Sequence, residues 1–217
     1  MLGPFLTALD WFGVAVFAVT GALTASRKQM DIFGFILLGA VTGMGGGSLR
    51  DVMLGELPVF WVRAPEYLGI CVAVSAATFF LAHIPESRYR ALLWLDAAGL
   101  SLFCVVGADK ALEAGANGFI AAAMGVISAT FGGIVRDILG GESPLMLRKE
   151  IYVTAALAGA SAFVALVALG LPPAAAAIAG FALCFVIRAL ALTYHWSLPV
   201  YRAREGRTVD EVDKLKK

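Results

Sequence analysis

Two short segments of the chain combine glycines with a charged pair, and they are nearly the same segment. Gly46–Asp51 (GGSLRD) returns 86 residues later as Gly132–Asp137 (GGIVRD). Backbone carbonyls at a glycine-rich bend can replace part of an ion's hydration shell, and charges inside a membrane mark ion or substrate pathways. The two segments therefore indicate chemistry of moving solutes rather than of making bonds.

The match extends well beyond these segments. Residues 10–58 align with residues 96–144 without a gap, and 16 of the 49 positions are identical. Shared apolar composition would produce matches in Leu, Val and Ala. The identities here include Gly, Asp, Arg, Glu and Pro, so we interpret them as an internal repeat.

The composition is that of a membrane protein. Of the 217 residues, 60% are hydrophobic and only 15% are charged, and the mean hydropathy is +0.84. A soluble domain would carry about 25% charged residues. The net charge of +1 gives no reason to expect a nucleic-acid partner. We find no paired-carboxylate, Ser-His or metal-binding pattern, so we expect neither an enzyme nor a cofactor.

Seven apolar stretches are long enough to span a bilayer, which takes roughly 20 residues. They lie at about residues 7–26, 31–57, 65–83, 91–111, 117–140, 149–170 and 173–194. The sequence thus predicts an all-α polytopic membrane protein. Prolines, glycines and charged residues separate the stretches.

Basic residues occur in alternate loops, which predicts the orientation of the chain. Arginine and lysine follow the first, third, fifth and seventh stretches, at Arg27, Lys28, Arg88, Arg90, Arg148, Lys149 and from Arg202 onward. The other loops contain few. This pattern predicts an N-terminus outside the cell and a C-terminus in the cytoplasm.

Each repeat contains three stretches, an odd number, so the second repeat enters the membrane from the opposite side. The sequence predicts a three-helix repeat at residues 1–90 and an inverted repeat at 91–172. A seventh helix at 173–200 and a charged cytoplasmic tail at 201–217 have no counterpart.

The glycines lie well inside their stretches. Each glycine costs about 1 kcal/mol relative to alanine in a helix interior, so we expect stretches 31–57 and 117–140 to be unwound or kinked there. Such backbone is tolerated only inside protein or beside a water-filled cavity. The alternative is close helix packing, because glycine lets two backbones touch.

The charged pairs require partners at membrane depth. Adjacent residues on a helix do not face each other, so we expect crossed pairs, Arg50 with Asp137 and Arg136 with Asp51. The pairs either pin the two helices or line a permeation path, and both roles are compatible.

Three further charged positions depend on where the helices begin and end. Asp10 and Asp96 stand near the start of their stretches and are interpreted as helix caps or first-turn carboxylates. Lys110 has no charged counterpart in the first repeat. It either extends to the outer interface or projects into a pore mouth.

At these residues the chain resembles a known family. Seven stretches in a three-plus-three-plus-one order, with GGG-x-x-RD in the second and GG-x-x-RD in the fifth, are similar to the prokaryotic trimeric intracellular cation channels. The same bacterial sequences are also grouped under a glycine-transporter domain. The resemblance covers about residues 5–195.

The resemblance implies a homotrimer in the prokaryotic inner membrane, with a pore in each protomer walled by kinked stretches 31–57 and 117–140. It implies a monovalent cation as permeant, mainly potassium, with sodium also considered. By position, the kink residues are Gly45, Gly46, Gly47, Gly132 and Gly133, and the pore hydroxyls are Thr42, Ser48, Ser128 and Thr130. Lys110 resembles a basic residue linked to voltage response in animal members.

Two functions therefore compete. A passive cation channel is the leading hypothesis, because carbonyls and hydroxyls at a helix break can coordinate an ion. The alternative is a secondary transporter of a small zwitterion such as glycine, since inverted repeats with broken helices are also typical of transporters.

Overall fold

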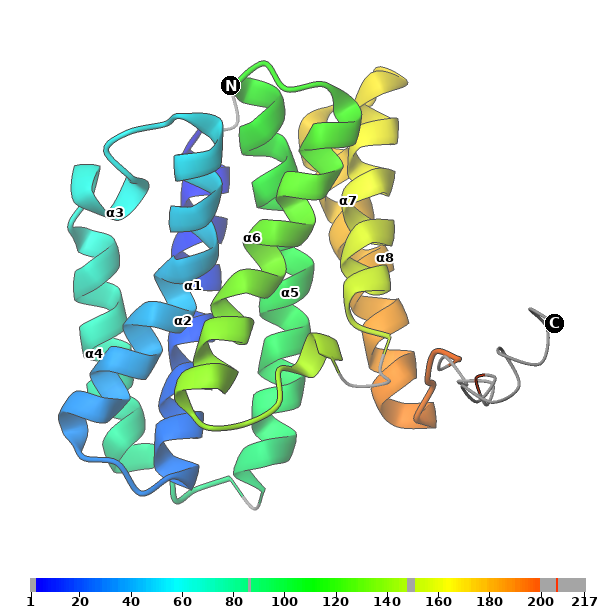
Figure 1. Cartoon of the computed structure of the whole chain (residues 1–217). Coiled ribbons are helices and arrows are strands. Elements are labelled where there is room, and N and C mark those ends of the chain that lie inside the picture. Colours follow the sequence, from blue (N-terminus) through cyan, green and yellow to red (C-terminus); the bar gives the residue numbers. More distant parts are fainter. Residues whose placement is uncertain (1–2, 86, 148–150, 200–205, 207–217) are drawn as a thin grey trace, which may run out of the picture.

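The computed structural model of the chain describes residues 3–85, 87–147, 151–199 and 206, with side chains from residue 8 onward. Seven long helices and two short ones make up these residues (Figure 1). They are α1 (Gly3–Arg27), α2 (Ile32–Leu54), α3 (Phe60–Arg63), α4 (Glu66–Leu81), α5 (Arg88–Glu113), α6 (Gly118–Leu139), the 3-10 helix η1 (Leu145–Leu147), α7 (Val153–Ala168) and α8 (Pro173–Tyr194). The predicted tail at 201–217, apart from Gly206, and the basic residues Arg148 and Lys149 lie outside the described residues.

The seven long helices correspond to the seven predicted stretches. Five of them, α1, α2, α5, α6 and α8, are long and apolar enough to cross a membrane. The other two, α4 and α7, have 16 residues each and are shorter apolar helices. At 1.5 Å per residue they extend about 24 Å, a few ångströms less than the hydrocarbon core of a bilayer.

The repeat extends to the way in which helices begin. The Asp31 side chain caps α2 by accepting from the Gly34 N–H at 2.8 Å, and the Asn117 side chain caps α6 by accepting from Ile120 N–H at 3.0 Å. Residues 31 and 117 are 86 apart. Each cap satisfies an amide at the first turn that has no partner within the helix.

The two repeats pack against each other through matched contacts. The rings of Phe17 and Phe103 have centroids 5.1 Å apart at the centre of the bundle. A Cβ at Gly99 would collide with the Phe17 ring, and a Cβ at Gly13 would lie 3.0 Å from the Phe103 ring. The reciprocity of these contacts is what a pseudo-two-fold axis produces.

Helices α2 and α6 run side by side in opposite directions through the middle of the molecule (Figure 1). They touch backbone to backbone. A Cβ at Gly46 would collide with the Ser128 carbonyl, and a Cβ at Gly132 would collide with the Thr42 carbonyl. The two contacts are equivalent in the repeat, because Gly46 corresponds to Gly132 and Thr42 corresponds to Ser128, each 86 residues later.

The helical backbone is continuous through both glycine clusters. The described helices are therefore not unwound there, whereas a kink at these glycines stays a prediction. The close packing considered as the alternative is present at Gly46 and Gly132. Because hydrogen bonding inside each helix is retained, glycine's conformational cost is offset by the short interhelical distance that it permits.

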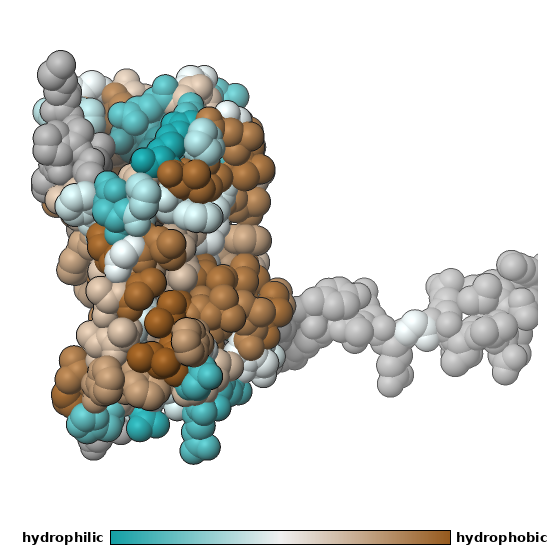
Figure 2. All heavy atoms as spheres, turned by 90° about the vertical axis from the view of Figure 1, so that its left-hand side faces the viewer, coloured by the Kyte–Doolittle hydropathy of each residue, from teal (hydrophilic) through white to brown (hydrophobic). Residues whose placement is uncertain are grey.

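The surface and the ends of the molecule agree with a membrane setting. Figure 2 shows hydrophobic side chains over most of the middle of one face and hydrophilic side chains gathered at its two ends. At one end, Arg27 after α1 contacts Glu142 after α6 at 2.9 Å. Two loops predicted to be cytoplasmic thus lie at the same end of the bundle.

Candidate functional site

The first charged pair is formed within one helix. Arg50 Nε and Nη2 donate to Asp51 Oδ1 at 2.9 and 2.6 Å, and Arg50 is almost fully buried. The second carboxylate oxygen of Asp51 accepts from the Phe60 backbone N–H at 2.8 Å. Asp51 therefore both neutralises its neighbour and ties α3 to the end of α2.

The second pair repeats this arrangement. Arg136 Nε donates to Asp137 Oδ1 at 2.9 Å, and Asp137 Oδ2 accepts from the Leu145 backbone N–H at 2.9 Å. Leu145 begins η1, which stands in the second repeat where α3 stands in the first. Each Asp thus holds a short helix that returns to the bundle after a proline.

The predicted crossed pairs, Arg50 with Asp137 and Arg136 with Asp51, are wrong. Helices α2 and α6 are antiparallel and cross at Gly46 and Gly132, so the charges follow the crossing in opposite directions. Counted from the contact of Gly46 with Ser128, Arg50 lies four positions along α2 and Asp137 nine positions along α6 in the opposite direction, which is about 20 Å along the axes at 1.5 Å per residue. The long arginine side chain instead curls to the next residue.

Asp10 also has a different role from the one predicted. It is a buried residue of α1, which begins at Gly3, so it is not a cap. Its Oδ2 accepts from Lys110 Nζ at 2.7 Å and from the Tyr67 hydroxyl at 3.2 Å. Asp10 is the counter-ion of Lys110, which lies at the cavity described below and not at a lipid-facing position.

The capping role predicted for Asp96 is also wrong. The residue lies in the interior of α5, which begins at Arg88, and is fully buried. Arg136 Nη1 donates to Asp96 Oδ1 at 2.7 Å and to Thr20 Oγ1 at 3.1 Å. Both aspartates were expected near helix starts because the predicted stretches begin at residues 7 and 91, whereas α1 and α5 begin at Gly3 and Arg88.

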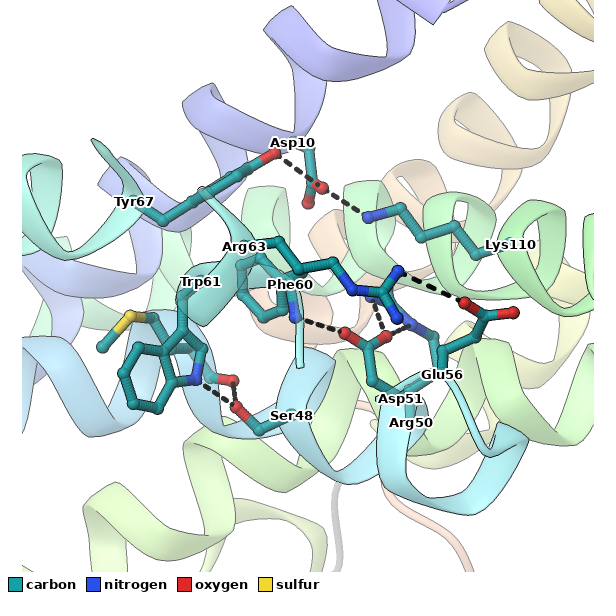
Figure 3. A network of polar contacts seen from close by, with 11 residues as sticks. Asp10, Ser48, Arg50, Asp51, Glu56, Phe60, Trp61, Arg63, Tyr67 and Lys110 are labelled. Atoms are coloured by element: carbon teal, nitrogen blue, oxygen red, sulfur yellow. Dashed lines mark hydrogen bonds and ion pairs between the residues drawn. The ribbon is translucent and has the colours of Figure 1, made fainter. Parts of the chain in front are cut away.

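A polar cavity of about 370 Å³ opens at the end of the bundle where α2 and α5 finish. Figure 3 shows the charged residues that converge there from α1, α2, α3 and α5, together with Tyr67 from α4. The lining residues are Arg50, Asp51, Leu54, Glu56, Phe60, Arg63, Ala64, Tyr67, Lys110, Glu113 and Ala114. The lining contains three basic and three acidic side chains, so the cavity attracts neither sign of charge strongly.

The ring of Phe60 lies close to two cations, the buried Arg50 and the partly exposed Lys110. Its centroid is 5.9 Å from the Arg50 guanidinium carbon and 5.6 Å from Lys110 Nζ, distances at which a ring face attracts a cation. Its edge packs on Gly47, where a Cβ would lie 2.7 Å from the ring. Gly47 therefore provides space for Phe60.

In the second repeat, Arg188 of α8 packs on Tyr152, the residue that matches Tyr67 of the cavity. Tyr152 is 2% exposed, and the Arg188 guanidinium from α8 lies 5.1 Å from the centre of its ring. Arg188 also donates to the Ile151 carbonyl at 3.2 Å. The seventh helix, which has no repeat counterpart, thus places its intramembrane arginine over the buried Arg136 network.

Known proteins share this fold and much of this sequence. A family profile described as "Glycine transporter" matches residues 7–83 and 93–168, one match in each repeat. A solved structure, described as the TRIC trimeric intracellular cation channel orthologue from Rhodobacter sphaeroides, is 62% identical and has a TM-score of 0.87. The alignment covers 88% of this chain and 99% of that one. This chain belongs to the TRIC family.

Other members of the TRIC family agree. The inner membrane protein YadS of Escherichia coli is 40% identical over 200 residues, which cover 91% of this chain and 97% of YadS. A second structure, described as "Structural basis for conductance through TRIC cation channels", is 32% identical with a TM-score of 0.81 and covers 92% of this chain and 98% of that one. The protein is an integral membrane protein of the bacterial inner membrane.

The hydroxyls that the TRIC resemblance suggested for a pore do not line the charged cavity. Those of Thr42, Ser48 and Thr130 donate to carbonyls one turn earlier in their own helices. Ser48 also accepts from Trp61 Nε1 at 2.9 Å. Ser128 Oγ is buried against Gly107 of α5, where an added Cβ would lie 2.5 Å from it, and has no hydrogen-bond partner among the described residues.

The glycines predicted as kink residues separate into two kinds. Gly46 and Gly132 are in backbone contact, and Gly47 accommodates Phe60. At Gly45 an added Cβ would lie 3.5 Å from the Gly132 Cα, and at Gly133 it would lie 3.2 Å from the Tyr152 hydroxyl, so both have room for a methyl group or nearly so. The described structure therefore assigns the closest packing to Gly46 and Gly132.

The position of Phe60 beside the two cations and the pairing of Asp10 with Lys110 were not predicted from the sequence. Tyr67 and Tyr152 lie at matching places 85 residues apart, one less than the repeat offset, and so do Phe60 and Leu145. That shifted match after the prolines was the available signal for α3 and η1. Within the described residues, no group of three or more His, Cys, Asp or Glu could hold a metal ion.

Proposed function

We propose that this protein is a channel for monovalent cations, mainly potassium, with a pore in each protomer. The observation that carries the proposal is the 62% identity, over 88% of this chain, to a protein described as a trimeric intracellular cation channel. The TM-score of 0.87 indicates that the two backbones superimpose closely. The solved relatives are named as channels, which agrees with a function other than catalysis.

The geometry supports a path that begins at the charged cavity. Its balanced lining would let a cation approach Glu56, Glu113 or Asp51 without a strong trap, which is what rapid conduction requires. The path would continue past the α2–α6 crossing. Beside it the Ser128 hydroxyl, which packs against Gly107 of α5, has no hydrogen-bond partner among the described residues.

In the described conformation the crossing is tightly packed. Gly46 and Gly132 each leave no room for a Cβ against the opposite helix. Conduction would therefore require α2 and α6 to bend or separate at Gly45–Gly47 and Gly132–Gly133. Thr42, Ser48, Ser128 and Thr130 would then face the opened path, in the role that the family resemblance gives them.

Assembly as a homotrimer is part of the proposal, because the relative from Rhodobacter sphaeroides is described as trimeric. Native mass spectrometry of the purified protein in detergent should give three protomers. A monomer that still conducts would contradict the trimer while leaving the pore in each protomer intact.

Transport of a small zwitterion such as glycine is the second candidate. Two observations favour it: the description of the family profile, and a cavity whose three basic and three acidic side chains suit a molecule carrying both charges. A carrier would open its cavity to one side of the membrane at a time, and the charged cavity opens at one end of the bundle.

Recording from planar bilayers separates the two functions. Reconstituted protein should give unitary currents whose reversal potential follows the potassium gradient. A matched measurement of glycine counterflow in vesicles should show none. Counterflow without unitary current would reject the channel and establish the carrier.

A further inference from the structure

The second glycine of each charged motif has different surroundings in the two repeats. In the first repeat the Phe60 ring packs on Gly47, where an added Cβ would lie 2.7 Å from the ring. The residue that matches Phe60 in the second repeat is Leu145, which has no ring. The place beside Gly133, the counterpart of Gly47, therefore lacks the apolar ring that occupies it in the first repeat.

Polar atoms surround the place beside Gly133. The three atoms nearest to a Cβ added there are Tyr152 Oη at 3.2 Å, Arg136 Nη2 at 3.5 Å and Asp96 Oδ1 at 3.6 Å. These side chains come from the residue before α7, from α6 and from α5, and all three are buried. Three elements thus bring polar groups to one point inside the protein.

Each of the three side chains has one buried polar atom without a hydrogen-bond partner among the described residues. These atoms are Tyr152 Oη, Arg136 Nη2 and Asp96 Oδ2. The remaining polar atoms of Arg136 and Asp96 are bound, for example Arg136 Nη1 to Asp96 Oδ1 at 2.7 Å. Buried polar groups in native proteins are paired in the great majority, with ordered water where no protein atom is within reach. Three unpaired atoms around one point indicate a bound molecule that joins them.

The size and the charges of the site select the kind of molecule. A Cβ added at Gly133 would have its nearest neighbours at 3.2–3.6 Å, so one non-hydrogen atom fits there. An anion would be repelled by the Asp96 carboxylate, and a cation would be repelled by the Arg136 guanidinium. A neutral molecule that both donates and accepts hydrogen bonds meets neither repulsion. Water has this size and this chemistry.

We propose that one water molecule is bound beside Gly133 and joins Arg136, Asp96 and Tyr152. Its oxygen accepts from Arg136 Nη2 and from the Tyr152 hydroxyl, and it donates one hydrogen to Asp96 Oδ2. Three hydrogen bonds are typical of a buried water. Gly133 provides the room for this water, as Gly47 provides room for Phe60. The site does not depend on whether the protein is a channel or a carrier, because it can be tested without ion flow.

A crystal structure at a resolution that shows ordered water tests the site directly. The map should contain one peak at about 2.7–3.2 Å from both Arg136 Nη2 and Asp96 Oδ2. The map of the Gly133→Ala variant should lack this peak, because the methyl group takes its place. A map of the parent protein with ordered water elsewhere in the interior, but none at this point, would overturn the proposal.

The stability of Gly133→Ala tests whether the water matters to the fold. Displacement of the water leaves three buried polar atoms without a partner, so the equilibrium constant for unfolding in sodium dodecyl sulfate should rise about tenfold. Gly45→Ala is the matched control, because its added Cβ has its nearest contact at 3.5 Å and should have little effect. Equal stability of the Gly133→Ala and Gly45→Ala variants would contradict the proposal.

The variant Tyr152→Phe separates loss of the water from steric crowding. The atom nearest to a Cβ at Gly133 is the Tyr152 hydroxyl, so crowding would be relieved once this hydroxyl is removed. A water that joins Arg136 and Asp96 would still be displaced. Gly133→Ala should therefore raise the unfolding constant of Tyr152→Phe protein as well, by about fivefold.

No effect of Gly133→Ala in the Tyr152→Phe protein would mean that crowding is the whole cause, and the proposal would fail. If Gly133→Ala does not fold in either background, the map of the parent protein decides. Absence of ionic current from the parent protein would reject the channel and leave the water site standing.

Discussion

At the level of single residues, the two buried arginines differ in their charged partners. Arg136 pairs with both Asp96 and Asp137, and all three side chains are nearly inaccessible. Arg50 has only Asp51 as a charged partner within 4 Å among the described residues, and that pair borders a cavity that water can enter. A buried charge left without its partner is far more costly than one that water can reach.

The variant Arg136→Ala should therefore destabilise the protein more than Arg50→Ala. Loss of Arg136 leaves two buried carboxylates uncompensated, and removal of one partner from such a network costs about 3–5 kcal/mol. Loss of Arg50 exposes Asp51 to the cavity and should cost less. Unfolding of purified protein by sodium dodecyl sulfate, followed by circular dichroism, measures both.

A triple variant, Arg136→Met with Asp96→Asn and Asp137→Asn, is the control for charge. It should recover part of the lost stability, because no carboxylate remains unpaired. Equal losses of stability for Arg50→Ala and Arg136→Ala would mean that water in the cavity does not lower the cost of leaving Asp51 unpaired.

Residue identities could be predicted better than partners. The doubled Arg-Asp motif marked Arg50, Asp51, Arg136 and Asp137, but their pairing followed from an antiparallel crossing that spacing cannot reveal. The pairing of Asp10 with Lys110 joins residues 100 positions apart. No local pattern specifies such a contact, and the broken symmetry at Thr24 was its only sign.

At the level of elements, the crossing of α2 and α6 is the central feature. Glycine at positions 46 and 132 allows two backbones to meet, and van der Waals contact at this short distance contributes to association without a hydrophobic driving force. The glycines could instead serve mainly to bend the helices. The neighbouring Gly45 separates these roles, because it belongs to the same cluster but has room for a methyl group.

The variants Gly46→Ala and Gly132→Ala should strongly destabilise the fold, whereas Gly45→Ala should be mild. An added Cβ at the first two positions meets a backbone carbonyl that cannot move without separating the helices. At Gly45 the nearest atom is the Gly132 Cα at 3.5 Å, an ordinary contact. Thermal unfolding in detergent gives the order of stability.

Gly69→Ala is a matched control, because nothing lies within 4 Å of its added Cβ. It should have little effect. If Gly45→Ala proved as damaging as Gly46→Ala, helix bending rather than packing would be the role of the whole cluster.

The elements themselves were largely predictable. Apolar length located all seven long helices, and α8 begins and ends where its stretch was predicted. The short helices α3 and η1 were missed because four and three residues are too few for a periodic pattern. They are positioned by backbone amides bound to Asp51 and Asp137, a tertiary contact that sequence does not display.

At the level of the whole molecule, the repeat is symmetric in fold and asymmetric in access. Lys110 and the cavity occur in one half, while Arg188 of α8 covers the corresponding place in the other half. Two ends follow from this: one with the cavity, and one where Arg27, Lys28 and Glu142 meet. The distribution of basic loops predicts that the end with the cavity faces outward.

Cysteine labelling in whole cells would test this orientation. Ala114→Cys lies at the cavity end, and Ile84→Cys lies in the loop between α4 and α5; both positions are exposed. A membrane-impermeant maleimide should label Ala114→Cys in intact cells and should label Ile84→Cys only after permeabilisation. The three native cysteines are buried and should contribute little background. The reverse pattern would place the cavity at the cytoplasmic side, so that cations would meet the charged cavity from inside the cell.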